Sequence, residues 1–303
     1  MSATTDDRNR ELAQLVDAMT ATDGLFDTAW PGLRVSRISS PIARVPVTYL
    51  PSLCVVVQGQ KRIFLGGETY TYNPANYLVS PLAMPLEMEI LAATRNHPVL
   101  GLGLEIDLAQ VSELMLSIDD PTAATPRSSC CQKALFVSQT GPAIQDALIR
   151  LLKSLANPTD LRVLGPAITR EVLYRLLQGE QSGQIRQLVQ NGSSGHRVAG
   201  VVRYLSENFG ERLSIEDIAQ HAGMSPSSLH QKFREVTGMS PLQYLKKIRL
   251  HHARTAMVEQ GLNAREAGYR VGYGNPSQFS REFKRMFGVP PAQLVKELLG
   301  AGG

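Results

Sequence analysis

The chain is poor in cysteine and has no long apolar run. Of its 303 residues only Cys54, Cys130 and Cys131 are cysteines, and two of these are sequence neighbours. This excludes the disulfide framework that stabilises many small secreted domains. No apolar stretch approaches the roughly 18 residues that a membrane-spanning helix needs. Residues 1–10 are polar, unlike a secretory signal, so we expect a cytoplasmic protein with no membrane partner.

The remaining composition is that of a folded protein with an uneven charge distribution. Hydrophobic residues make up 43% and charged residues 19%, which excludes collagen-like and wholly disordered chains. The length predicts about two domains of roughly 150 residues. From His196 onward, 15 Lys and Arg stand against 9 Asp and Glu, a net +6, whereas the rest has 16 against 18, a net −2. This asymmetry indicates a nucleic-acid-binding surface joined to a nearly neutral domain.

The residue pattern changes along the chain from β-rich to helical. Residues 34–106 contain short β-rich runs separated by Gly, Pro and Asn, which predict a small barrel or sandwich. Helical periodicity flanks this region, for example at 144–155. The stretch 191–195, with the sequence NGSSG, is typical of a flexible connector. We therefore predict an N-terminal sensing and dimerisation domain (residues 1–190), a linker (191–195) and a C-terminal DNA-binding domain (196–303).

The C-terminal domain is predicted to be all-helical and to contain a repeat. Ser214 followed by Asp217 indicates a capping box, and Ser225-Pro226 indicates the start of the next helix after a turn at Gly223. The segment SIEDIAQHAGMSPSSLHQKFREVTGMSPLQYL recurs as NAREAGYRVGYGNPSQFSREFKRMFGVPPAQLV. Caps, turns and core positions coincide in the two copies. Two helix-turn-helix units are thereby favoured over a helical bundle without DNA function.

The second helix of each copy has one apolar and one polar face. Leu229 and Phe233 in the first copy, like Phe279 and Phe283 in the second, are spaced four apart and are predicted to be core. The opposite face carries residue types that can read base edges in a major groove. The predicted DNA contacts are Ser227, His230, Gln231 and Arg234 in the first unit, and Asn275, Ser277, Ser280, Arg281 and Lys284 in the second.

These segments resemble the AraC/XylS family of bacterial transcription regulators. GMSPSSLHQKFREVTGMSPLQYLKKIRLHHAR and VGYGNPSQFSREFKRMFGVPP are similar to its two signature segments. The resemblance implies a long helix, roughly Pro241 to Glu259, that joins two units binding successive major grooves. It also implies structural or DNA-backbone-contacting roles for Arg249 and Arg254. Ala267-Gly268 departs from the usual Ile-Ala of the family, and a glycine within a helix predicts a looser second unit.

The N-terminal half resembles the variant cupin-like domain of one branch of this family. The similarity lies in PSLCVVVQGQKRIFLGGETYTYNPANYLVSPLAMP. It implies an α+β two-domain fold, with a cupin-like β-barrel and flanking helices before the all-α domain. It also suggests an effector pocket at Cys54, Val56, Phe64 and Tyr72. Metal-dependent cupins need two or three histidines, and this half has only His97, so we expect no metal, no cofactor and no catalytic residue.

We therefore interpret the chain as a sequence-specific DNA-binding transcription regulator, and not an enzyme, controlled by a small-molecule effector. The expected partners are promoter DNA, a second copy of the chain in a homodimer, and RNA polymerase if the protein is an activator. Two alternatives stay open: an N-terminal domain that only dimerises or binds a partner protein, and an enzymatic activity of the barrel. DNA-repair methyltransferases with a similar helix-turn-helix need a four-cysteine zinc site, which is lacking.

Two short motifs invite separate hypotheses. Cys130-Cys131 could form a redox switch, or could be incidental loop residues beside a buried Cys54. His251-His252 lies on the predicted joining helix, where neighbouring side chains point about 100° apart and do not form a compact ligand pair. A solvated or phosphate-facing role is therefore predicted for both histidines.

Overall fold

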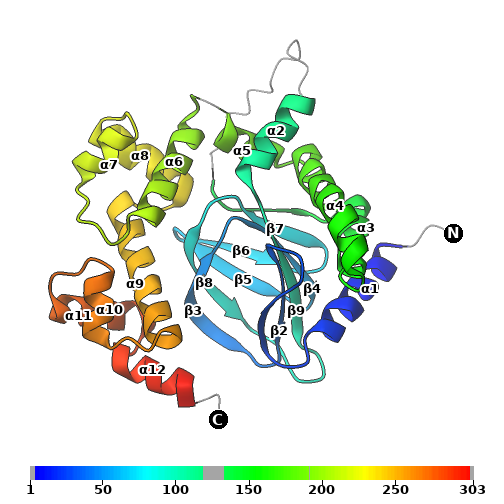
Figure 1. Ribbon diagram of the computed structural model, residues 1–303, viewed down its shortest axis with the longest axis horizontal. Helices are drawn as coiled ribbons and strands as arrows, with labels where there is room; N and C mark the ends of the chain where they lie inside the picture. Colours follow the sequence, from blue (N-terminus) through cyan, green and yellow to red (C-terminus); the bar gives the residue numbers. More distant parts are fainter. Residues whose placement is uncertain (1–3, 119–132, 191, 301–303) are drawn as a thin grey trace.

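The computed structural model describes residues 4–118, 133–190 and 192–300. The redox hypothesis for Cys130 and Cys131 lies outside these residues. The described part of the chain has a two-sheet β domain followed by a helical domain (Figure 1). The fold class expected from the sequence is thereby confirmed.

The N-terminal domain consists of two antiparallel sheets. One has six strands in the order β1-β2-β9-β4-β7-β10, and the other has four in the order β3-β8-β5-β6. The strands are β1 (Gly24–Asp27), β2 (Leu33–Ile38), β3 (Ile42–Tyr49), β4 (Ser52–Gln58), β5 (Lys61–Leu65), β6 (Glu68–Tyr72), β7 (Asn76–Ser80), β8 (Met84–Ile90), β9 (Val99–Glu105) and β10 (Phe136–Gln139). Because successive strand residues point to opposite faces, β4 serves two cores. Leu53 and Val55 face the flanking helices, whereas Val56 faces the barrel interior.

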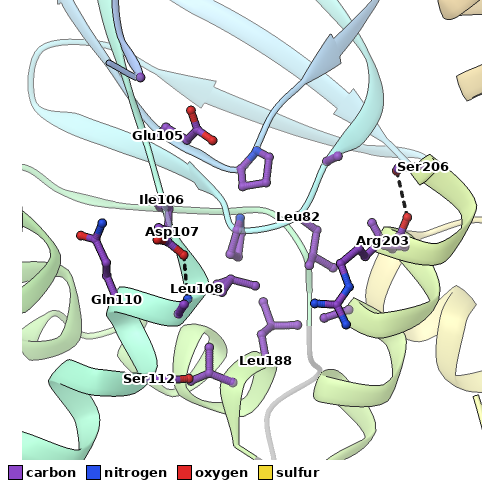
Figure 2. A pocket seen from close by; sticks show the side chains of 18 of the residues that line it. Leu82, Glu105, Ile106, Asp107, Leu108, Gln110, Ser112, Leu188, Arg203 and Ser206 are labelled. Atoms are coloured by element: carbon purple, nitrogen blue, oxygen red, sulfur yellow. Dashed lines mark hydrogen bonds between the residues drawn. The ribbon is translucent and has the colours of Figure 1, made fainter. Parts of the chain in front are cut away.

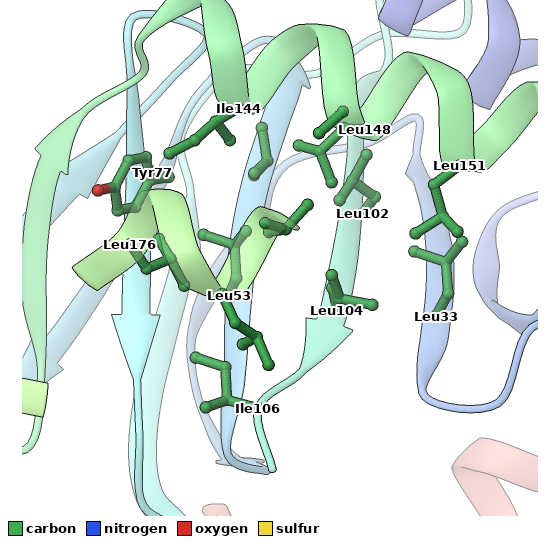
Figure 3. Close-up of a cluster of buried hydrophobic side chains, with 14 of the residues drawn as sticks. Leu33, Leu53, Tyr77, Leu102, Leu104, Ile106, Ile144, Leu148, Leu151 and Leu176 are labelled. Carbon is green, nitrogen blue, oxygen red and sulfur yellow. The ribbon is translucent and has the colours of Figure 1, made fainter. Parts of the chain in front are cut away.

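Three helices cover the outer face of the six-stranded sheet. They are α1 (Thr5–Met19), α3 (Pro142–Ser154) and α4 (Pro158–Gln178). Figure 3 shows Ile144 and Leu148 of α3 above the strand residues Tyr77 and Leu102, with Leu176 of α4 beside them. The predicted period of the segment 144–155 is therefore explained by packing on the sheet.

The remaining helices bridge to and build the C-terminal domain. They are α2 (Leu108–Ile118), α5 (Ser182–Val189), α6 (Ser194–Glu207), α7 (Ile215–His221), α8 (Pro226–Thr237), α9 (Pro241–Glu259), α10 (Ala264–Arg270), α11 (Pro276–Phe287) and α12 (Pro291–Gly300). Ser193 caps α6, so Ser194 and Gly195 of the predicted linker are helical. Helix α5 packs on α6, which leaves only a short connection between the two domains.

The helix ends form as the sequence predicts. Ser214 and Asp217 form the expected capping box, and Ser225 caps α8 with Pro226 at its first position. Helices α8 and α11 end at Gly238 and Gly288, both with positive φ. A left-handed glycine ends a helix without the steric cost that a Cβ would bring. The two predicted helix-turn-helix units are thus confirmed as local structures.

The two helix-turn-helix units belong to different hydrophobic cores. Buried residues of the first unit, such as Phe233 and Tyr244, form one cluster with barrel residues such as Ile63 and Met84. The second unit has its own cluster, centred on Phe279 and Phe283. Helix α9 passes between the units and packs beside β3 and β8 (Figure 1). The core of the first unit is therefore continuous with the barrel core, whereas the second unit is held by α9 and touches the barrel where α11 meets β3.

Candidate nucleic-acid interface and junction cavity

The first unit presents its predicted recognition face to solvent. Leu229 and Phe233 are fully buried, which turns the opposite side of α8 outward. The four predicted contacts Ser227, His230, Gln231 and Arg234 are all exposed. The Gln231 amide donates to Glu235 Oε1 at 2.9 Å, so this side chain is held beside a carboxylate. The face can meet DNA phosphates and base edges without rearrangement of its core.

The second unit has the same arrangement with a stronger positive charge. Ser277, Arg281 and Lys284 on α11 are exposed, and Ser280 is half-buried. Asn275 acts as the helix cap, because its Oδ1 accepts from the backbone N–H of Ser277 at 2.8 Å. Only the amide nitrogen of Asn275 is therefore available for the predicted DNA contact. All nine predicted contacts stay predictions as to what they bind.

An acidic residue of α11, Glu282, is neutralised by its neighbours. The Tyr273 hydroxyl donates to Glu282 Oε2 at 2.8 Å, and Lys246 Nζ on α9 lies 3.0 Å from Oε1. Burial raises the pKa of this carboxyl, but these hydrogen bonds outweigh it and hold the pKa below its usual value. Glu282 thereby fixes α11 on α9. This role was not predicted from the sequence, although Lys246 and Glu282 lie on two helices that were.

Arg249 fastens the joining helix to the loop after α6. Its Nε donates to the Phe209 carbonyl at 2.7 Å, and its Nη2 donates to the Glu211 carbonyl. Gly272, at the turn of the second unit, has φ +87°, and a Cβ there would lie 2.6 Å from the Gly210 oxygen. Only glycine fits this close approach. The family resemblance implied either a structural or a DNA-backbone-contacting role for Arg249, and these contacts favour the structural role.

Arg254 is half-buried and lies over an aromatic ring. Its guanidinium carbon is 5.9 Å from the centre of the Phe287 ring, and burial lowers its pKa. Part of the side chain is therefore used in packing. Its predicted DNA-backbone contact stays a prediction.

The predicted solvated role is wrong for His251. Its side chain is 9% exposed and meets the Phe287 ring edge-on, with 5.6 Å between ring centres. Burial is the main cause that lowers its pKa to about 3, and nearby cations such as Arg254 add to it. His252 is exposed but stacks on Phe209 at 3.9 Å. The helical period placed the two rings on different faces, but it could not tell which face was covered.

Close packing of α10 on α11 explains the glycine at position 268. A Cβ at this position would lie 3.1 Å from Cγ of Phe279, so the glycine lets α10 and α11 approach closely. The departure from the family pattern at Ala267-Gly268 therefore coincides with a large aromatic partner. The predicted looseness of the second unit stays a prediction.

The four predicted effector residues do not share one space. Cys54, Val56 and Tyr72 belong to the barrel interior, where the Tyr72 and Tyr49 hydroxyls lie 3.1 Å apart. Burial raises the pKa of the Cys54 thiol, which disfavours a reactive thiolate. Phe64 lies on the opposite face of β5, with the Arg44 guanidinium 4.0 Å from its ring centre. An effector in the barrel could therefore touch three of the four.

A cavity of about 990 Å³ lies at the junction of the two domains (Figure 2). We call it the junction cavity. Its walls come from the barrel loops, the start of α2, helix α4, the end of α5 and one side of α6. Its lining includes Trp30, Pro51, Leu82, Ala83, Leu104, Glu105, Ile106, Asp107, Leu108, Gln110, Ser112, Thr169, Leu188, Val189, His196, Ala199, Gly200, Val202, Arg203, Ser206 and Glu207. None of the four predicted effector residues lines it.

The described residues include neither a metal-binding cluster nor a membrane-spanning helix. Within residues 4–118, 133–190 and 192–300, no group of three or more His, Cys, Asp or Glu side chains is placed to hold a metal ion. No helix in the same ranges is long and apolar enough to span a membrane.

Family models match both halves of the chain. The model described as the AraC-type transcriptional regulator N-terminus matches residues 29–184, which are just over half of the 303 residues. A model of a helix-turn-helix domain matches residues 218–297. The second match contains both predicted recognition helices.

Curated relatives are transcription regulators. The chain is 27% identical over 148 residues to the HTH-type transcriptional regulator ArgR of Pseudomonas aeruginosa, covering 48% of this chain and 45% of that protein. It is 28% identical over 149 residues to the HTH-type transcriptional activator RhaS of Salmonella schwarzengrund, covering 48% and 51%. The matched part thus spans about half the length of these relatives.

Solved structures share the overall fold. An apo variant of ToxT from Vibrio cholerae aligns with a TM-score of 0.60 at 11% identity, covering 89% of this chain and 98% of that one. ToxT bound to an unsaturated fatty acid aligns with a TM-score of 0.59 at 11% identity, covering 87% and 94%. At this identity the likeness shows the fold alone.

Proposed function

Because the chain belongs to the family of AraC-type transcriptional regulators, we propose that it is a sequence-specific DNA-binding regulator controlled by a small-molecule effector. The observation that carries the proposal is the pair of helix-turn-helix units on one helix. Helices α8 and α11 expose polar and basic faces, and α9 joins their two units. Two such helices on one rigid connector fit two major-groove segments roughly 10 base pairs apart.

Selection of bound fragments from random DNA, followed by footprinting with the full chain, tests this proposal. We expect two protected segments about one helical turn apart on one DNA face. The affinity should fall with salt, with a log–log slope of about 0.9 per phosphate contact. Protection of a single groove would contradict docking of both units, and no salt-dependent binding would refute the proposal.

Effector control is supported by a cavity between the domains. A ligand changes an equilibrium only if it prefers one of two arrangements, and a site bounded by both domains can have this preference. The alternative, an N-terminal domain that only dimerises or recruits a protein, needs no such hollow. Repeating the DNA selection with a panel of metabolites distinguishes the two, because the alternative predicts the same affinity with every metabolite.

The proposed partners are promoter DNA and a second copy of the chain, with RNA polymerase added if the protein activates transcription. The proposed location is the cytoplasm, and we propose no enzymatic activity. Light scattering of the full chain at tens of micromolar tests the dimer. A monomer mass at that concentration would overturn the proposed homodimer.

A further inference from the structure

The junction cavity has mainly apolar walls. Leu82 from the β7–β8 loop, Leu108 from α2 and Leu188 from α5 face the same space (Figure 2). Trp30 closes one side and packs on α4 at Gly165, where a Cβ would lie 2.6 Å from the indole ring. A volume of about 990 Å³ is within the range of small-molecule sites. Apolar walls of this extent favour a ligand with an apolar body.

Two features of the walls point to a ligand rather than to a packing fault. The Thr169 hydroxyl is buried with no hydrogen-bond partner in the described structure, and its residue is 9% exposed. Gly200 lies inside α6, and a Cβ there would meet nothing within 4 Å. A glycine within a helix is destabilising relative to alanine, so this small residue keeps the space open at a cost. A buried unpaired hydroxyl is also costly unless a bound group satisfies it.

The cavity wall carries basic groups on α6 and carboxylates on both α6 and the start of α2. The Arg203 guanidinium reaches the cavity from α6, and none of the described residues gives it a hydrogen bond or an ion pair (Figure 2). His196 adds a second basic group from the same helix. The carboxylates Glu105 and Asp107 lie near the start of α2, where Asp107 Oδ1 accepts from the Ala109 backbone N–H at 2.8 Å. Glu207, one turn after Arg203 on α6, also lines the cavity and forms no ion pair with Arg203 among the described residues. An anion is therefore favoured beside Arg203 and His196, N-terminal to Glu207 along α6.

We propose that the junction cavity binds an apolar organic anion, with its apolar body against Leu82, Leu108 and Leu188 and its anionic group on Arg203. The inference deepens the proposed function, on which it rests, by giving the effector a site and a chemical class. The Thr169 hydroxyl supplies a further hydrogen bond. The site differs from the barrel interior around Val56 and Tyr72.

The cavity wall is directly connected to the first DNA-binding unit. The Tyr244 hydroxyl of α9 donates to the Ala83 carbonyl at 2.7 Å, and Ala83 lines the cavity. The Tyr244 ring meets the Phe233 ring of α8 edge-on at 5.6 Å. Helix α6, which also lines the cavity, packs on both α8 and α9. A ligand that shifts the β7–β8 loop or α6 therefore also shifts α9, the helix that joins the two helix-turn-helix units.

Two fluorescent probes that differ by one charge test the site. They are 8-anilino-1-naphthalenesulfonate, which is an apolar anion, and N-phenyl-1-naphthylamine, which lacks the sulfonate. We expect the full chain to bind one equivalent of the anionic probe. Arg203→Gln should weaken the anionic probe about tenfold and the neutral probe less than twofold, and Arg203→Lys should restore most of the anion binding. Arg162→Gln, an exposed change on α4 outside the cavity, is the matched control and should change neither.

A filling variant tests the location independently of charge. Gly200→Leu should abolish binding of both probes, and Gly200→Ala should raise the melting temperature and leave the fold intact. If Gly200→Leu does not fold, the comparison of Arg203→Gln with Arg203→Lys decides whether the cavity is the binding site. No binding of the anionic probe, or equal binding by wild type and Arg203→Gln, overturns the inference. Weakening by Val56→Phe but not by Arg203→Gln would place the site in the barrel and also overturn it.

The outcome is separable from that of the proposed function. If the chain binds DNA but its probe affinity does not depend on Arg203, only the inference about the junction cavity is refuted. If probe binding depends on Arg203 but the chain has no specific DNA affinity, only the proposed function as a DNA-binding regulator is refuted. Coupling is tested with Tyr244→Phe, which should keep probe affinity within twofold and remove any change in DNA affinity that the anionic probe causes. A persisting change would refute the coupling through Tyr244.

Discussion

At the scale of single residues, Arg281 and Lys284 separate base recognition from phosphate binding. Both are exposed on α11 and three positions apart. Arg281→Ala should cost about 1–3 kcal/mol on the selected site and relax preference at one base pair, because a guanidinium can bind guanine in two places. Lys284→Ala should weaken all sequences about equally and lower the salt slope by about one. Binding-site selection with each variant measures both effects, and an unchanged sequence preference for Arg281→Ala would contradict its base-reading role.

The buried His251 gives a prediction for pH dependence. Its pKa is lowered from 6.5 to about 3, so the unfolded chain takes up its proton at a higher pH than the folded chain. The contribution of neutral His251 is therefore complete above about pH 6.5 and is lost as the pH falls towards 3. His251→Leu should reduce the slope of stability against pH by about 1.4 kcal/mol per unit between pH 6 and 4.

Urea unfolding of wild type and His251→Leu at a series of pH values provides the measurement for this residue. The difference between the two chains isolates His251 from the other titrating groups. Parallel curves between pH 6 and 4 would show that the imidazole is accessible to protons in the folded chain. His252→Leu is the comparison on the same helix: burial lowers the pKa of His252 as well, but this side chain is exposed, so a smaller change of slope in the same direction is expected.

At the scale of elements, the two recognition helices end alike but in different surroundings. Gly238 and Gly288 have φ values of +72° and +82°. A Cβ at Gly288 meets nothing within 4 Å, whereas one at Gly238 would lie 3.2 Å from Cα of Gly66 in the barrel. Gly288→Ala should therefore cost about 1–2 kcal/mol, the price of the left-handed conformation alone. Gly238→Ala should cost more, because the β5–β6 turn must also move.

Denaturant unfolding of the two glycine variants checks this order. Equal losses of stability would mean that the contact between Gly66 and Gly238 is not maintained in solution. Gly67→Ala is a suitable control, because Gly67 lies next to the contact with φ +89° and a Cβ there would meet nothing within 4 Å. Its cost should therefore equal that of Gly288→Ala.

At the scale of the whole molecule, the division into cores predicts the order of unfolding. The single tryptophan of the chain, Trp30, lies in the N-terminal domain and reports on it by fluorescence. Phe233 and Phe283 are both fully buried, but Phe233 belongs to the core shared with the barrel and Phe283 to the separate core. Replacement of either by alanine should cost about 3–5 kcal/mol locally. Phe233→Ala should lower the midpoint of the Trp30 transition, and Phe283→Ala should leave it nearly unchanged.

Hydrogen exchange followed by peptide mass spectrometry locates the effect of each variant. Phe283→Ala should increase exchange in α10, α11 and α12 only. An increase that also includes the barrel strands would mean that the two cores unfold as one unit and would contradict the division seen in the structure. Phe233→Ala should increase exchange in both α8 and the barrel strands.

The parts of this protein that depend on local geometry can be predicted from its residues alone. Capping at Ser214 and Asp217, glycine ends such as Gly238, and the helical period of α8 and α11 involve residues close in the chain. Their backbone preferences are therefore present before any long-range contact forms. The same local patterns, repeated after about 49 residues, identified two helix-turn-helix units and their exposed faces.

Tertiary structure alone decided which of these faces is covered, and by what. Strand alternation separates Ile63 from Phe64 but does not say which points inward, and helical period does not say that His251 is buried. The joining of the first unit to the barrel depends on contacts such as that between Tyr244 and Ala83, 161 residues apart. The junction cavity arises in the same way, because its walls come from loops and helices that meet only when the whole chain packs. No local preference encodes a space between distant segments, since that space is set by how their surfaces fit together.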